Sequence, residues 1–332
     1  MLYDIIIIGG GPAGVAAGVY SARKRMKTLL LTESFGGQSI VSDDIQNWIG
    51  EPHISGFELA EKMEAHIRSF SDVVDIKISE LVTGVKKIDC DDPRSARTGG
   101  RPCNFEVTTE GGKIYEGKAL ILASGARRKK LGVSGEEEFN GKGVVFCSTC
   151  DAPLFGGKDV VVVGGGNAGV EAVIDLLPYA NHIYLLHRSE TLKADPATVE
   201  EMKKNSKVEL ILNAETVKIE GDKFVTSLTY KNKKTGEEKT LPVGGVFIEV
   251  GSTPNSEIVK GIVDIDSWGQ VIMDSKHAST SHPGIFAAGD VTDDPYKQNN
   301  ISAGDAVKAA LAAYAYILQL KKRTPASEEV TG

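Results

Sequence analysis

An aliphatic run that leads into a glycine-rich loop occurs twice in this chain, and no other feature constrains the fold as strongly. The run Asp4–Ile8 precedes Gly9-Gly10-Gly11-Pro12-Ala13-Gly14, and the run Asp159–Val163 precedes Gly164-Gly165-Gly166-Asn167-Ala168-Gly169. Such runs are typical of strands that are buried on both faces of a parallel sheet. Because GxGxxG after a strand is a dinucleotide-binding fingerprint, the sequence predicts an α/β fold with two Rossmann-like dinucleotide-binding domains.

In the first copy, each glycine of the fingerprint has a separate physical task. We expect Gly9 to allow a tight turn, Gly11 to let a pyrophosphate approach the backbone, and Gly14 to let the following helix pack on the strand. The next predicted strand, Thr28–Thr32, ends at Glu33. That carboxylate can accept hydrogen bonds from the ribose hydroxyls of an adenosine. The alternative is a glycine-rich turn that only connects a strand to a helix.

The second copy differs from the first in the charge that follows its second strand. The predicted strand Ile183–Leu186 ends at His187 and Arg188, and Lys193 follows a few residues later. A guanidinium suits a 2′-phosphate, so this loop is predicted to bind NADPH. The alternative is that Arg188 and Lys193 are solvated surface charges.

A CxxC pair, Cys147-Ser148-Thr149-Cys150, lies shortly before the second glycine loop. This spacing allows a disulfide, and it also serves as half of a zinc site or as a structural pair. Redox chemistry is favoured, because no further ligands have zinc spacing. Asp151 follows directly and can handle the proton of a departing sulfur, although it can also be a helix N-terminal carboxylate. We expect Cys90 and Cys103 to be free, unreactive thiols.

The composition narrows the class of protein. The chain has 332 residues, of which 41% are hydrophobic and 25% charged, which is enough for two domains of ordinary size. Its net charge of −7 argues against nucleic acid as a partner. The apolar runs noted above are far shorter than the roughly 20 residues of a membrane span, and no export signal is visible, so a cytoplasmic location is expected.

Several further motifs, taken with the loops and the CxxC-Asp sequence, resemble a known family over nearly the whole chain. They are Phe35-Gly36-Gly37-Gln38, Asn47-Trp48-Ile49-Gly50, Ala123-Ser124-Gly125-Ala126, Gly284-Ile285-Phe286-Ala287-Ala288-Gly289-Asp290-Val291 and Tyr296-Lys297-Gln298-Asn299. The chain is similar to the low-molecular-weight thioredoxin reductases and to the reductase half of the alkyl hydroperoxide reductase flavoprotein. A helix is also expected to begin near Ser302 and Asp305, with a core-facing apolar stripe of Val307, Leu311, Tyr314, Ile317 and Leu318.

The resemblance implies FAD on the first loop and a nicotinamide dinucleotide on the second. It implies a discontinuous FAD-binding domain, residues 1–123 and 251–332, with an NAD(P)H-binding domain, residues 124–250, inserted in it and carrying the CxxC. The implied FAD contacts are Gly9, Gly11, Pro12, Ala13, Gly14, Glu33, Gly37, Gln38, Asn47, Ser124, Gly125, Gly289, Asp290, Lys297, Gln298 and Asn299. The implied NADPH contacts are Gly164, Gly166, Asn167, Ala168, Gly169, His187, Arg188, Ser189 and Lys193.

The activity implied by the resemblance is NADPH-dependent reduction of thioredoxin. By this analogy Cys150 lies nearest the flavin, Cys147 attacks the partner's disulfide, Asp151 handles the proton, and one domain rotates against the other during turnover. The resemblance also implies a homodimer and no bound metal. An N-terminal thioredoxin-like extension is not expected.

Four alternatives remain open at this point. Family members that use NADPH carry Arg where Ser189 stands and a later Arg where Lys193 stands, so NADH use stays possible. The acceptor can also be a glutaredoxin-like or peroxide-reductase adaptor protein. Less favoured are a dithiol oxidase, which would not need the second loop, and a redox sensor without turnover.

Overall fold

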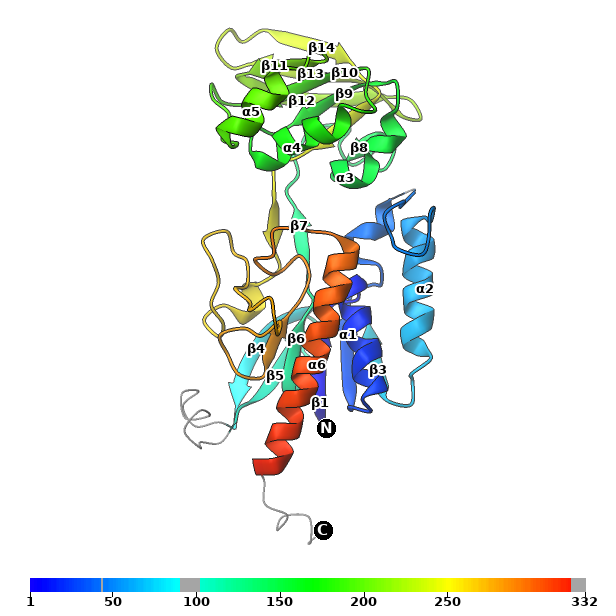
Figure 1. Cartoon of the computed structure of the whole chain (residues 1–332), viewed down its shortest axis with the longest axis vertical. Helices are drawn as coiled ribbons and strands as arrows, with labels where there is room; N and C mark the ends of the chain where they lie inside the picture. Colours follow the sequence, from blue (N-terminus) through cyan, green and yellow to red (C-terminus); the bar gives the residue numbers. More distant parts are fainter. Residues whose placement is uncertain (43, 90–101, 324–332) are drawn as a thin grey trace. The chain divides into compact units, whose positions relative to one another are not determined.

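The computed structural model describes residues 1–42, 44–89 and 102–323, which form two compact units (Figure 1). Unit 1 comprises residues 1–40, 55–127 and 253–332, and unit 2 comprises residues 41–54 and 128–252. The two main boundaries lie within a few residues of those expected from the sequence. The segment 41–54 differs, because it groups with unit 2 although the sequence places it in the first domain. Which cofactor each unit binds stays a prediction.

Unit 1 is built on a seven-stranded sheet. The order is β3-β2-β1-β6-β5-β4, with β17 also paired to β6. The pairs β3–β2, β2–β1, β1–β6 and β6–β17 are parallel. The pairs β6–β5 and β5–β4 are antiparallel. The strands are β1 (Leu2–Ile8), β2 (Thr28–Thr32), β3 (Val74–Ile78), β4 (Val82–Ile88), β5 (Asn104–Thr109), β6 (Ile114–Leu122) and β17 (Ile285–Ala287).

Both faces of β1 are covered, which explains its unbroken aliphatic sequence. Ile6 and Ile8 belong to a core cluster with Phe105 and Val271 on one face, and Ile7, which points to the other face, is fully buried as well. The helices of this unit are α1 (Pro12–Arg23), α2 (Gly56–Arg68) and α6 (Asn299–Arg323), with the 3₁₀ turns η1 (Gly37–Val41) and η4 (Glu257–Val259).

Helix α6 packs against α1, β6 and β17, and its buried side is made of small residues. The buried apolar residues are Ala306, Ala309, Ala310, Ala313 and Ile317. The predicted stripe is therefore wrong at Leu311 and Leu318, which are 41% and 40% exposed. Small side chains suit the buried side of α6, because this helix packs on α1, whose buried residues are also mostly small, and small side chains allow two helices to approach closely.

The predicted start of α6 is also wrong by about one turn. The helix begins at Asn299, and Ser302 donates its backbone N–H to Gln298 inside the first turn. Asp305 does not act in capping but forms an ion pair of 2.6 Å with Lys308. Within the described residues, α6 is also the one helix whose length and composition would allow it to cross a membrane. In the structure this helix packs against α1, β6 and β17 of unit 1.

Unit 2 has a five-stranded parallel sheet between two different layers. Its order is β11-β10-β9-β15-β8; α4 and α5 cover one face, and the antiparallel sheet β12-β13-β14 packs on the other. The strands are β8 (Val144–Val145), β9 (Asp159–Val163), β10 (His182–His187), β11 (Val208–Leu212), β12 (Ala214–Gly221), β13 (Val225–Asn232), β14 (Glu238–Pro242) and β15 (Gly245–Ile248). The helices are α3 (Ser148–Asp151), α4 (Asn167–Leu176) and α5 (Pro196–Lys203), with the turn η3 (Ala152–Phe155).

The chain passes between the units twice, and the two passages pair with each other as β7 (Ala126–Arg128) and β16 (Ser252–Pro254). On the side of unit 1, the Asn255 side chain donates to the carbonyl of Ser124 at 2.6 Å. The Arg127 guanidinium donates to the Asn255 amide oxygen. These contacts hold the two passages together where they enter unit 1.

One cysteine prediction is corrected by the structure. Cys103, expected to be a free thiol, is buried and disulfide-bonded. Cys90 lies outside the described residues. No local pattern indicated this bond, because Cys103 stands in a polar stretch with no spacing motif.

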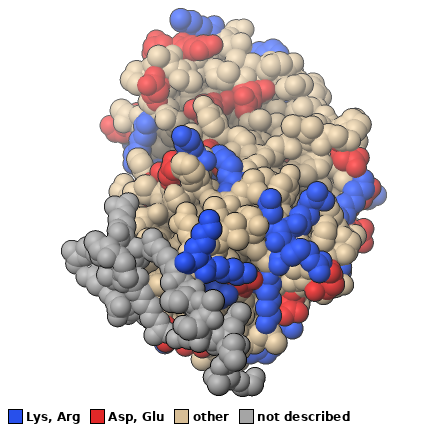
Figure 2. All heavy atoms as spheres, turned by 60° about the horizontal axis from the view of Figure 1, so that its bottom comes forward, with Lys and Arg blue, Asp and Glu red and all other residues tan. Residues whose placement is uncertain are grey.

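Lysine and arginine side chains gather on the face that the lower end of Figure 1 presents, with carboxylates among them (Figure 2). Ion pairs form near the amino ends of the unit 1 strands. Lys118 contacts Asp4 at 2.8 Å, and Arg25 contacts Asp72 at 2.6 Å. This end of the sheet therefore carries both positive and negative charges.

Candidate active site

The first glycine loop has the backbone shape that a dinucleotide requires. Gly9 has φ +120°, and a Cβ there would collide with the carbonyl oxygen of Ala123. A Cβ at Gly14 would collide with the Gly9 carbonyl. At Gly11 a Cβ would meet nothing nearer than Gly37, at 3.7 Å. The outer glycines thus permit packing, whereas a Cβ on the middle one would make only ordinary contact, which leaves its backbone accessible to a pyrophosphate, so the residues fit FAD.

The other predicted flavin contacts in unit 1 come from its N-terminal and C-terminal parts. The Gln38 amide donates to the carbonyl of Ala126, and Ser39 donates to the Asn299 amide oxygen at 2.8 Å. Lys297 donates to the carbonyl of Thr292 at 2.6 Å. Burial lowers the pKa of Lys297, although nearby carboxylates oppose this shift. Pro12, Ala13, Glu33, Ser124, Gly125, Gly289, Asp290 and Gln298 also lie in unit 1.

The second loop repeats the first in detail. Gly164 has φ +145°, and a Cβ there would collide with the carbonyl oxygen of Glu249. A Cβ at Gly169 would collide with the Gly164 carbonyl, and one at Gly166 would meet nothing within 4 Å. The residues therefore fit a second dinucleotide, on strand β9 and helix α4.

Two cations lie beside this second loop. His187 ends β10 and is buried against the loop, since a Cβ on Gly165 would collide with its ring. Burial lowers the pKa of His187, a backbone hydrogen bond with Thr191 opposes this shift, and the charges of Arg188 and Lys193 add to it. Arg188 and Lys193 are not buried, and within the described residues neither forms an ion pair. They therefore offer two uncompensated positive charges, with Ser189 beside them.

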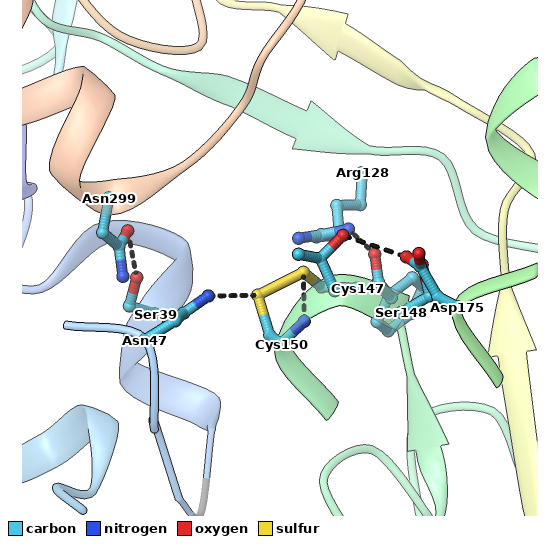
Figure 3. The surroundings of a disulfide bond; sticks show 10 residues. Ser39, Asn47, Arg128, Cys147, Ser148, Cys150, Asp175 and Asn299 are labelled. Atoms are coloured by element: carbon cyan, nitrogen blue, oxygen red, sulfur yellow. Dashed lines mark hydrogen bonds between the residues drawn. A yellow bond between two sulfur atoms is a disulfide. The ribbon is translucent and has the colours of Figure 1, made fainter. Parts of the chain in front are cut away.

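The CxxC pair forms a disulfide at the start of α3 (Figure 3). The Cα atoms of Cys147 and Cys150 are 5.3 Å apart, and the backbone N–H of Cys150 donates to the Cys147 sulfur at 3.2 Å. On α4, the Asp175 carboxylate accepts from Ser148 at 2.8 Å and from Thr149 at 3.1 Å. These hydroxyl contacts fix the two residues between the cysteines.

Asn47, which the sequence assigned to the flavin, is found beside the disulfide. It groups with unit 2, and its amide donates to the Cys150 sulfur at 3.8 Å (Figure 3). The predicted acid Asp151 is 7% exposed and ends α3, one residue beyond Cys150. In the part of the chain that the structure describes, no cluster of His, Cys, Asp or Glu is suited to hold a metal ion.

Three charged residues near the disulfide were missed by sequence reasoning: Arg128, Asp175 and Glu249. Arg128 donates to the carbonyl of Phe146, just before the CxxC. Glu249 follows β15 directly, and burial raises the pKa of its carboxyl group to about 7, while the charge of Arg128 opposes the rise. A signal for Glu249 was present, since it is a carboxylate placed directly after a fully buried strand, at the carboxyl edge where ligands of parallel sheets bind.

Residues 3–313 match the sequence profile of the pyridine nucleotide-disulphide oxidoreductases. The chain belongs to this family. A solved thioredoxin reductase from Streptococcus pyogenes superposes with a TM-score of 0.86 at 35% identity, and the match covers 96% of this chain and 99% of that one. The resemblance to thioredoxin reductases is therefore confirmed, as is the prediction of two Rossmann-like domains.

Curated relatives of this oxidoreductase carry two kinds of name. An alkyl hydroperoxide reductase component of Pseudomonas aeruginosa is 41% identical over 96% of this chain and 58% of its own length. An NADH dehydrogenase of Bacillus subtilis is 39% identical over 96% of this chain and 59% of its own length. The oxidoreductase thus spans less than two thirds of these curated relatives, so the activity of the longer proteins does not transfer to it directly.

Proposed function

We propose that this oxidoreductase is an FAD-dependent thioredoxin reductase that uses NADPH. The balanced reaction is NADPH + H⁺ + a protein disulfide, giving NADP⁺ and a protein dithiol. The single observation that carries the proposal is the disulfide Cys147–Cys150, which lies in the same unit as the second dinucleotide loop. A dithiol in that position is suited to exchange with a disulfide on another protein.

We assign FAD to unit 1 and NADPH to unit 2. When bound, FAD would accept a hydride from the nicotinamide and pass two electrons to the disulfide. The chain supplies binding and orientation: the first loop and Gln38 hold FAD, and the second loop with Arg188 and Lys193 holds NADPH. Rotation of one domain against the other during turnover remains part of this proposal.

Each residue at the redox pair has one role in the proposal. Cys147 attacks the partner's disulfide as a thiolate, which the backbone N–H of Cys150 would stabilise. Cys150 then attacks Cys147, releasing the reduced partner and restoring the disulfide. Asp151 gives the departing sulfur its proton. Asn47 orients the Cys150 sulfur through its amide.

A second candidate is an NADH-using reductase of a glutaredoxin-like or peroxide-reductase adaptor protein. The names of the two curated relatives favour it. Two features of the chain favour NADPH, namely the cations Arg188 and Lys193. Neither has a carboxylate partner within the described residues, which leaves both available to a 2′-phosphate. A cytoplasmic homodimer is also part of the main proposal.

Purified partners and both dinucleotides test the two candidates together. The FAD-loaded protein is assayed with NADPH or NADH and with thioredoxin, a glutaredoxin-like protein or a peroxide-reductase adaptor domain as acceptor. We expect the highest kcat/KM with NADPH and thioredoxin. A higher value with NADH and the adaptor domain would support the second candidate instead, and no turnover with any acceptor would contradict both.

A further inference from the structure

The side chain of Asp175 joins the helix of the second dinucleotide loop to the redox turn α3. Helix α4 begins at Asn167 in that loop, and Asp175 lies in its last turn. A carboxylate is unfavourable there, because the C-terminal end of a helix carries a partial negative charge and aspartate is a poor helix former. Local helix stability therefore does not account for this residue, and the reason for it lies in its contacts outside α4.

One carboxylate oxygen of Asp175 accepts both hydroxyl groups of the CxxC motif (Figure 3). Ser148 donates from its Oγ at 2.8 Å and Thr149 from its Oγ1 at 3.1 Å, both to Oδ2. Hydrogen bonds to a carboxylate are roughly twice as strong as those between neutral groups. The two residues between the cysteines are therefore held to α4.

Helix α4 is a firm support for these contacts. Its residues Val170, Val173 and Leu176 are fully buried in a core cluster that also contains Ala152 and Phe155, from the turn η3 after α3. The chain that follows the CxxC is thus fixed to α4 by packing. The hydrogen bonds of the carboxylate extend this attachment into the CxxC itself.

The redox turn needs this attachment most when its disulfide is open. It has only four residues, and isolated helices that short are not stable in water. In the oxidised protein the bond between Cys147 and Cys150 closes the turn. When Cys147 is bonded to a partner's sulfur instead, no covalent bond between the two cysteines keeps them close. The hydrogen bonds from Ser148 and Thr149 can still do so, because neither involves a sulfur atom.

We propose that Asp175 is a positioning residue that keeps Cys150 within reach of Cys147 while the pair is open. The step that it assists is the second half of thiol–disulfide exchange. The Cys150 thiolate forms a bond to the Cys147 sulfur, and the bond from Cys147 to the partner's sulfur breaks. The partner's sulfur leaves with the electron pair and takes up a proton, so the exchange needs no other oxidant or reductant. Asp175 acts only by raising the effective concentration of the attacking thiolate.

The inference rests on the proposed function in requiring that the pair exchange with another disulfide, and its test uses neither a dinucleotide nor a protein partner. The purified protein is equilibrated with reduced and oxidised glutathione, quenched with acid, alkylated and digested with trypsin. The tryptic peptide 143–158 carries Cys147 and Cys150 and neither of the other cysteines. Mass spectrometry of this peptide gives the ratio of the internal disulfide to the glutathione mixed disulfide. At a fixed glutathione concentration, this ratio reports the effective concentration of the second thiol.

Variants separate the hydrogen bonds from the charge. We expect Asp175→Ala to lower the ratio about tenfold, near 1.4 kcal/mol, and Ser148→Ala combined with Thr149→Val to lower it equally. All of these changes together should lower it no further, because they remove the same interaction. Asp175→Asn keeps an acceptor oxygen and should stay within about threefold of the unaltered protein. Asp222→Ala, at an exposed aspartate of the same unit, is the control and should leave the ratio unchanged.

An unchanged ratio in Asp175→Ala, or in the protein with Ser148→Ala and Thr149→Val, would overturn the inference. An equally large fall in Asp175→Asn would assign the effect to the charge and would overturn it as well. Because the Ser148 and Thr149 changes leave the carboxylate in place, the test stands even if Asp175→Ala does not fold. If glutathione at any ratio of its two forms leaves the pair unchanged in every protein, the proposed function itself is contradicted, so the two failures are distinguishable.

Discussion

The two glycine loops have the same backbone geometry but different surroundings. In both, the first and third glycines are required by a collision with backbone, and a Cβ on the middle glycine would collide with nothing. The first loop is followed by the carboxylate Glu33 and the second by Arg188, and the second loop alone has a disulfide and Glu249 beside it in the described part of the chain. The difference teaches that one fold element serves two ligands, and that the residues placed around it decide the chemistry.

The strongest test of the shared geometry is to fill the required glycine in each loop. Gly9→Ala and Gly164→Ala both place a Cβ against backbone at positive φ, so we expect each to destabilise its own unit by about 3 kcal/mol or more. Urea unfolding combined with limited proteolysis measures this unit by unit. If either variant unfolds at the urea concentration of the unaltered protein, the loops do not share the constraint.

A stability effect specific to unit 2 is expected from Glu249. Its pKa is about 7 in the folded protein and 4.5 in an unfolded chain, so folded protein holds the proton more tightly. The protonated carboxyl group of Glu249 therefore stabilises the folded protein below pH 4.5, and this contribution is lost as the pH rises to about 7. Glu249→Gln should therefore be more stable than the unaltered oxidised protein at about pH 8, by up to about 3 kcal/mol, with no gain near pH 4.

Denaturant unfolding at the two pH values measures the difference. Glu201→Gln, exposed on the same unit, is the matched control and should show no such dependence. An equal gain for Glu249→Gln at both pH values would show that its effect is not one of ionisation.

Filling the middle glycines should separate the two ligands. At Gly11 and Gly166 an added Cβ has space in the protein but occupies the place of a pyrophosphate. We expect Gly11→Ala to weaken FAD binding and Gly166→Ala to raise the KM for NADPH, each by about thirtyfold, or about 2 kcal/mol. Flavin absorbance and steady-state kinetics measure the two effects. If Gly166→Ala loses flavin and keeps its KM, the assignment of cofactors to loops is reversed.

The smallest expected effect concerns the charges after each second strand. Arg188→Ala removes one contact to a 2′-phosphate, so the KM for NADPH should rise about tenfold, near 1.4 kcal/mol. The KM for NADH should stay unchanged, because NADH lacks that phosphate. Steady-state kinetics with both dinucleotides checks this. An equal rise for both would mean that Arg188 does not recognise the phosphate.

The sequence predicted the parts of this molecule that depend on local pattern. Both glycine loops, the strand Thr28–Thr32 and the disulfide-forming CxxC follow from short motifs whose backbone geometry is set by neighbouring residues. The core face of α6 could not be predicted, because it depends on how closely α1 packs against it. Where two helices pack closely, alanine is buried at the contact and the larger leucine side chains lie outside it.

Contacts between distant segments explain what else was missed. Asn47 and Cys150 are 103 residues apart, and Asp151 is also far in sequence from Glu249, although its charge acts on that carboxyl group. Neither pair has a spacing that a single sequence reveals. The raised pKa of Glu249 likewise arises from burial and from Arg128, Asp151 and Asp175, which meet only in the folded unit.

The central claim, that electrons leave this protein through one disulfide, is tested most directly by anaerobic stopped-flow mixing of the FAD-loaded protein with NADPH. Flavin absorbance and the reduction of added thioredoxin are followed in the unaltered protein, in Cys147→Ser and Cys150→Ser, and in Cys103→Ser as the control from the other unit. We predict that all four proteins bleach their flavin and that the unaltered protein and Cys103→Ser reduce thioredoxin, whereas Cys147→Ser and Cys150→Ser do not. Thioredoxin reduction at the full rate by either of these two variants would contradict the account.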